Sequence, residues 1–138
     1  MKTHKFLLDK LGRDKTAERM KKRGCNAKYH TLKDNAAYLD ALTQKIVEEL
    51  EEVFECDSKE DVIKELADLE EVLAAFKTLI QVDQKDVDKA RKEKLEERGG
   101  FTKRMYYEYV EVPENSSDHK YFASNPEKYP EIIEEIKD

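Results

Sequence analysis

Two adjacent stretches of the chain, residues 35–55 and 58–80, repeat their apolar residues every three to four positions. That period matches the roughly 3.6 residues per turn of an α-helix, so it places the apolar side chains on one helical face. Ser58 and Asp61 resemble the capping box that begins a helix, and the residues just before Ser58 form a turn. We therefore expect two long helices that fold back on each other as an antiparallel hairpin.

Four carboxylates lie on or beside these apolar faces, namely Glu49, Glu52, Glu65 and Asp68. The members of each pair are three residues apart, so they project from one face of their helix. At about 100° per residue, Glu49 and Glu52 fall on the same side of the first apolar stripe, whereas Glu48 points toward solvent. Carboxylates are almost never buried unless they are paired or bound to a metal. We therefore expect the four to bind one or two Mg²⁺ ions, with Mn²⁺ as a substitute; chance placement of acidic residues near the core is the alternative.

The composition favours an all-α fold that is completed by a second copy of the chain. Charged residues make up 42% of the 138 residues and hydrophobic residues only 38%, so one copy has enough apolar surface for a modest core alone. Helices with exposed apolar faces often complete their core by dimerising. We expect a single domain with a core of about residues 7–110, whose hairpin forms a four-helix bundle in a homodimer or a dimer of dimers.

The remaining elements are less regular. Arg13 to Arg23 and residues 84–98 are expected to be helices that end at Gly24 and at Gly99 with Gly100. Residues 101–112 alternate enough to predict a short strand. Residues 113–130 contain all three prolines and are expected to form a loop. Pro130 is placed to start a short terminal helix.

Charge is distributed unevenly along the chain. Residues 1–34 contain 11 basic and 4 acidic residues, whereas residues 35–80 contain 4 and 13. An acidic centre with basic neighbours suits a metal-bound polyanion, but the acidic overall balance and the lack of a basic face argue against nucleic acid. No segment approaches the roughly 20 apolar residues that span a membrane. Two cysteines without metal-ligand spacing predict free thiols, so we expect a soluble, cytoplasmic protein.

Several segments together resemble the MazG-like all-α nucleotide pyrophosphohydrolases, in the subgroup similar to phosphoribosyl-ATP pyrophosphohydrolase. The pattern EExxE covers residues 48–52, and ExxD covers residues 65–68. A subgroup stretch of the form LVRDKIP is present in altered form as residues 11–17, LGRDKTA. A second subgroup stretch, K-x3-RGGF-x-KR, is intact in residues 94–104. The acidic pattern alone is only moderately specific. The resemblance rests mainly on its occurrence together with the RGGF segment, in the right order.

The resemblance implies hydrolysis of a nucleoside triphosphate, or of a nucleotide like phosphoribosyl-ATP, to the monophosphate and pyrophosphate. It also implies that Glu49, Glu52, Glu65 and Asp68 are the Mg²⁺ ligands and catalytic residues, with Glu48 beside them. Cations near the phosphates would stabilise the leaving pyrophosphate. The candidates are Arg13, Lys15, Lys94, Arg98, Lys103 and Arg104. A non-catalytic acidic helical module that binds a nucleotide, a divalent ion or a basic protein is the alternative, and the base preference stays open.

Overall fold

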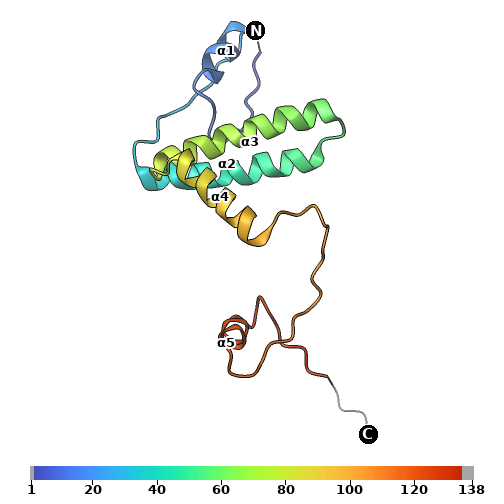
Figure 1. The fold of residues 1–138 in the computed structure, drawn as a ribbon. Helices are drawn as coiled ribbons and strands as arrows, with labels where there is room; N and C mark the ends of the chain where they lie inside the picture. Colours follow the sequence, from blue (N-terminus) through green and yellow to red (C-terminus); the bar gives the residue numbers. More distant parts are fainter. Residues whose placement is uncertain (1, 135–138) are drawn as a thin grey trace. The chain divides into compact units, whose positions relative to one another are not determined.

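The computed structural model describes residues 2–134, and over that range it contains five helices and no strand (Figure 1). The all-α class expected from the sequence is therefore confirmed. The chain divides into two compact units, the first ending at Glu97 and the second beginning at Arg98. The first unit contains the hairpin and all four carboxylates.

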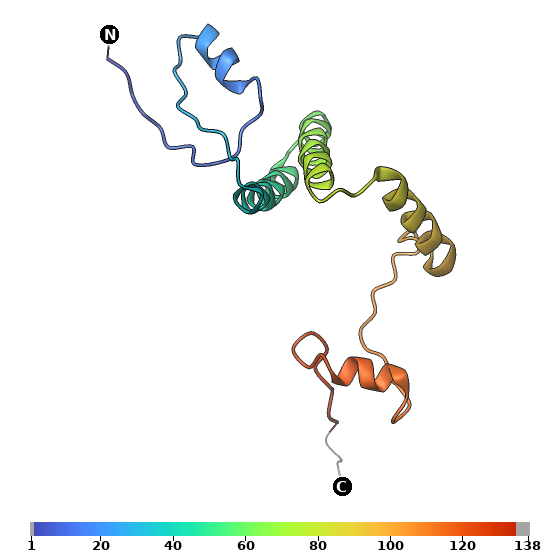
Figure 2. The same cartoon turned by 90° about the vertical axis from the view of Figure 1, so that its left-hand side faces the viewer.

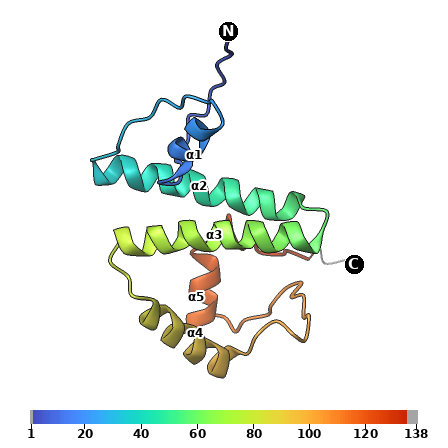
Figure 3. The same cartoon turned by 90° about the horizontal axis from the view of Figure 1, so that it is seen from above.

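The helices α2 (Asn35–Glu55) and α3 (Lys59–Leu79) form the antiparallel hairpin. Figure 2 shows the two helices nearly end-on and adjacent, and Figure 3 shows their opposite courses. The Asp34 carboxylate accepts a hydrogen bond of 3.2 Å from the Ala36 N–H and caps α2. The Ser58 hydroxyl caps α3 in the same way, because it accepts a hydrogen bond of 3.2 Å from the Asp61 N–H. The predicted helix start at Ser58 is confirmed.

The hairpin has a thin core. Leu42 on α2 is 1% exposed and is the one fully buried apolar side chain within residues 2–134. Other apolar side chains of the hairpin remain accessible; among them are Val47, Leu50, Phe54, Ile63 and Leu66. Two helices cannot cover each other on more than one face, so the outer apolar surface has no partner within the hairpin.

Glycines end the two polar helices as expected. In α1 (Thr16–Lys22), the chain leaves the helix through Gly24, whose φ is +80°, and the Gly24 N–H donates to the Lys21 carbonyl at 3.0 Å. The helix α4 (Gln84–Arg98) is followed by Gly99 with φ +78°. A residue without Cβ adopts this left-handed conformation at little cost.

The second unit differs from the sequence-based expectation. The strand predicted at residues 101–112 is wrong, because residues 105–112 make no backbone hydrogen bond with any described residue and a strand needs a neighbour. The loop predicted for residues 113–130 from its prolines is also only partly correct, because this range contains the helix α5 (Ser117–Ala123). The Ser116 hydroxyl caps α5 by accepting a hydrogen bond from the His119 N–H. Tyr121 and Phe122 of α5 pack with Tyr129, with ring centroids 5.0–5.9 Å apart.

The predicted terminal helix is absent from residues 131–134, and residues 135–138 lie outside the described part. Cys25 and Cys56 are free thiols, as expected. None of the helices in the described range combines the length and apolarity that crossing a bilayer requires.

Candidate metal centre

The hairpin brings carboxylates of both helices together. One carboxylate oxygen from each of Glu49, Glu65 and Asp68 lies within 4.8 Å of the other two. We call these three residues the carboxylate trio. Glu49 comes from α2, and the other two are one helical turn apart on α3. Hard divalent cations take carboxylate oxygens as ligands, so this donor set fits Mg²⁺ or Mn²⁺.

Two carboxylate oxygens of the trio are withdrawn from water. Glu49 is 6% exposed and is the one buried charged residue within residues 2–134. Its Oε2 atom has no hydrogen-bond partner, and neither does the buried Oε2 of Glu65. A buried carboxylate oxygen without a partner costs free energy, because it has lost its water and gained nothing in return. A bound cation would remove that cost at both atoms.

The pKa values of the α2 carboxyls report the same crowding. Burial is the main cause that raises the pKa of Glu49, and the negative charge of Glu52 raises it further, while Lys45 opposes the shift. Burial also raises the pKa of Glu52, and the nearby carboxylate of Glu65 adds to the effect. Glu52 is therefore a neighbour of the carboxylate trio, although it is not one of the three mutually close residues.

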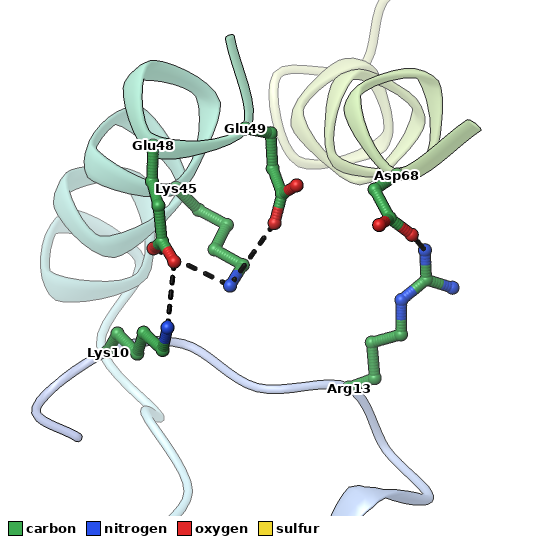
Figure 4. A network of polar contacts seen from close by, with 6 residues as sticks. All are labelled: Lys10, Arg13, Lys45, Glu48, Glu49 and Asp68. Atoms are coloured by element: carbon green, nitrogen blue, oxygen red, sulfur yellow. Dashed lines mark hydrogen bonds and ion pairs between the residues drawn. The ribbon is translucent and has the colours of Figure 1, made fainter. Parts of the chain in front are cut away.

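Three cations surround these carboxylates (Figure 4). Arg13 donates a hydrogen bond of 2.7 Å from its guanidinium to the Oδ1 atom of Asp68. The ammonium of Lys45 lies 3.4 Å from Oε1 of Glu49. Lys10 contacts Glu48 at 2.8 Å. The N-terminal segment that contains Lys10 and Arg13 thus lies against the acidic side of the hairpin.

Glu48 does not point into solvent, contrary to the helical-wheel expectation. Its side chain is 27% exposed and pairs with Lys10 at 2.8 Å and with Lys45 at 3.6 Å. These pairs lower its pKa, chiefly through the hydrogen bond from Lys10. The helical-wheel prediction was wrong because it considers only α2 itself. The segment that contains Lys10, 38 residues before Glu48 in the sequence, covers this side of the helix. Glu48 is thus a partner of cations beside the trio.

Sequence reasoning missed Lys45 and Lys10. Lys45 precedes Glu49 by four residues, a spacing at which side chains on a helix meet, so the pattern could have revealed it. No local pattern could have revealed Lys10, since its contact with Glu48 joins distant parts of the sequence.

The candidate phosphate-binding cations fall in different places. Arg13 reaches the carboxylate trio, and Lys15 is exposed at the start of α1. Lys94 borders, with Arg91 and Val87, a shallow groove of about 390 Å³ along α4. The other three are exposed residues of the second unit, whose position relative to the hairpin is not determined: Arg98, Lys103 and Arg104.

No protein-family model, curated protein or solved structure matches this chain. Its function must therefore be argued from the chemistry of the site.

Proposed function

We propose that this chain is a Mg²⁺-dependent nucleotide pyrophosphohydrolase, which cleaves a nucleoside triphosphate or a phosphoribosyl-ATP-like nucleotide to the monophosphate and pyrophosphate. The observation that supports it best is the pair of buried oxygens without partners, on Glu49 and Glu65, inside a trio of carboxylates from two helices. Residues 11–17 and 94–104, which resemble segments of this enzyme class, add further support. Free thiols agree with a cytoplasmic location, where such nucleotides are found.

The proposed metal ligands are Glu49, Glu52, Glu65 and Asp68. Bound Mg²⁺ would neutralise phosphate oxygens and lower the pKa of a coordinated water. A carboxylate within reach of that water would accept its proton, and Glu52, which lies beside the trio, is one candidate. In the proposed reaction, the oxygen of a water molecule would form a bond to the α-phosphorus, the bond from that phosphorus to the bridging oxygen would break, and pyrophosphate would leave.

The cations would bind the leaving pyrophosphate. Arg13 is already at the trio, paired with Asp68 and 60% exposed, so it can exchange a carboxylate for a phosphate at little cost. We assign the same role to the candidates farther along the chain: Lys15, Lys94, Arg98, Lys103 and Arg104. Their charge stabilises the negative oxygens that develop as the bond breaks.

A non-catalytic acidic module is the second candidate, and one observation favours it. Arg13, Lys10 and Lys45 already neutralise carboxylates around the trio without any ion. A basic protein partner or a structural divalent cation could use the same surface without chemistry.

The decisive experiment measures pyrophosphate release from a panel of ribo- and deoxyribonucleoside triphosphates, canonical and damaged, with Mg²⁺ and with a chelator. We expect pyrophosphate and monophosphate in equal amounts, only in the presence of the metal. Glu65→Gln should reduce turnover by about 100-fold or more. Glu71→Gln, an exposed position on the same helix, should leave turnover unchanged. Metal or nucleotide binding without release from any substrate would support the non-catalytic module instead.

A further inference from the structure

Lys45 is unusually enclosed for a lysine. Its side chain is only 16% exposed, and its ammonium lies between two carboxylates of the same helix, 3.4 Å from Oε1 of Glu49 and 3.6 Å from Oε2 of Glu48. Lysines are rarely withdrawn from water unless they are paired. Glu48 is itself held by Lys10 at 2.8 Å, so the ion pairs form a chain from the N-terminal segment to the carboxylate trio.

The two oxygens of Glu49 have different surroundings. Oε1 faces Lys45, whereas Oε2 is buried without a partner, and Figure 4 shows it on the side nearer to α3. The attraction of the ammonium for one oxygen favours the carboxylate orientation in which the other oxygen points away from Lys45. Glu49 is the one member of the trio that comes from α2, so the orientation of its carboxylate decides which oxygen α2 offers to the trio.

We propose that Lys45 is a positioning residue, which holds Glu49 by one oxygen so that the other is presented to a divalent cation. The inference rests on the metal centre of the proposed function and extends it to a residue that binds no metal. A protonated lysine has no lone pair and therefore stays outside the ligand set.

Positioning and simple charge compensation predict opposite results. If Lys45 only neutralises the trio, its removal leaves more negative charge and divalent cations bind more tightly. If Lys45 orients Glu49, its removal weakens binding, since groups that orient a metal ligand typically contribute about 10- to 100-fold in affinity.

The test measures Mn²⁺ affinity of the full-length chain at pH 8 by electron paramagnetic resonance. Lys45→Met should weaken binding about tenfold. Lys45→Arg keeps the charge and a donor, and should stay within about threefold of the wild type. The matched control is Lys64→Met on α3, which removes an equal charge from an exposed lysine and should not weaken binding.

A double-mutant cycle shows whether Lys45 acts through Glu49. Adding Lys45→Met to Glu49→Gln should weaken Mn²⁺ binding by less than about twofold, because the residue to be oriented is already gone. Equal effects in both backgrounds would overturn the proposal. Circular dichroism checks that each variant is folded; if Lys45→Met is not, Lys45→Gln should bind more weakly than Lys45→Arg.

The outcomes also separate the two proposals. A wild-type chain that binds no Mn²⁺ overturns the metal centre and the role of Lys45 together. A wild-type chain that binds Mn²⁺, with Lys45→Met binding equally or more tightly, overturns only the role of Lys45.

Discussion

Glu49 shows how a residue can oppose folding and still support a proposed function. Its helical position is the same as that of the buried Leu42, two turns earlier on the same face of α2. An apolar residue at position 49 would serve the core better, because Glu49 buries one oxygen without a partner. A charged residue that weakens the core in this way is a candidate for a functional site.

The metal-free protein should lose stability as the pH rises from about 4.5, the ordinary value for a glutamate, toward neutrality. The pKa of Glu49 is raised on folding, so the folded state holds its proton more tightly than the unfolded state does, and that advantage disappears as the pH rises through the raised value. The pKa of Glu52 is also raised on folding, so Glu52 adds to the loss of stability as the pH rises. The pKa of Glu48 is lowered on folding, so its contribution to stability increases with pH, but only below about pH 4.5. Thermal melting from pH 5 to 8 in a chelator measures the effect.

In that experiment Glu49→Gln should flatten the pH dependence. At pH 7 it should melt about 3 °C above the wild type without metal, a gain of about 1 kcal/mol, and gain less from added Mg²⁺. The exposed Glu51→Gln on the same helix is the control and should follow the wild type. A wild type that becomes more stable toward neutral pH would contradict this account.

Among the elements, α3 depends on its first turn. The Ser58 hydroxyl satisfies the Asp61 N–H, a donor that has no partner inside the helix. Ser58→Ala should therefore lower the free energy of unfolding by about 1 kcal/mol, measured by urea denaturation. Ser58→Thr keeps the acceptor and should recover most of the loss. Equal losses in the two variants would mean that the cap contributes nothing.

The end of α4 should matter more to substrate than its middle does. Arg98 is the last residue of α4 and precedes Gly99, where the backbone turns through a left-handed conformation. Arg98→Ala should lower kcat/KM about tenfold, the value of one charged hydrogen bond to phosphate. Arg91→Ala, two turns earlier on the same face, should change it by less than about twofold. Similar small effects of both would mean that this face is only a solvated surface.

The molecule as a whole has more apolar surface than one hairpin can cover. Val47, Leu50 and Phe54 recur on one face of α2 and are 40–77% exposed, while Ile63 and Leu66 are exposed on α3. These side chains are not covered within the hairpin. A second hairpin packed on them would make a four-helix bundle.

We therefore predict a homo-oligomer, most simply a dimer with twofold symmetry. Light scattering should give at least twice the 16.2 kDa mass of one chain. Phe54→Glu should shift the population to monomers, because it places a charge on the face that we expect to pair. Glu55→Lys, an exposed change next to it, is the control and should leave the mass unchanged. A wild-type monomer at working concentration would contradict the bundle.

The sequence determined helices α1 to α4 because the information for them is local. The apolar period, Ser58 as a cap and Gly24 as an end all act within a few residues, and each was found where it was expected. The carboxylate pairs follow from the same period, since residues three apart share a helical face. The predicted strand at residues 101–112 failed because a strand depends on a neighbour, which a local pattern does not supply.

Tertiary structure alone decided how the cations meet the carboxylates. Lys10 and Arg13 reach Glu48 and Asp68 across 38 and 55 residues of chain, and no periodicity relates such distant positions. It also decided which carboxylate is buried, because the helical wheel gives a direction but not what packs there. Glu49 lost its water through the fold of the hairpin, and Glu48 gained two cations through the segment that covers it.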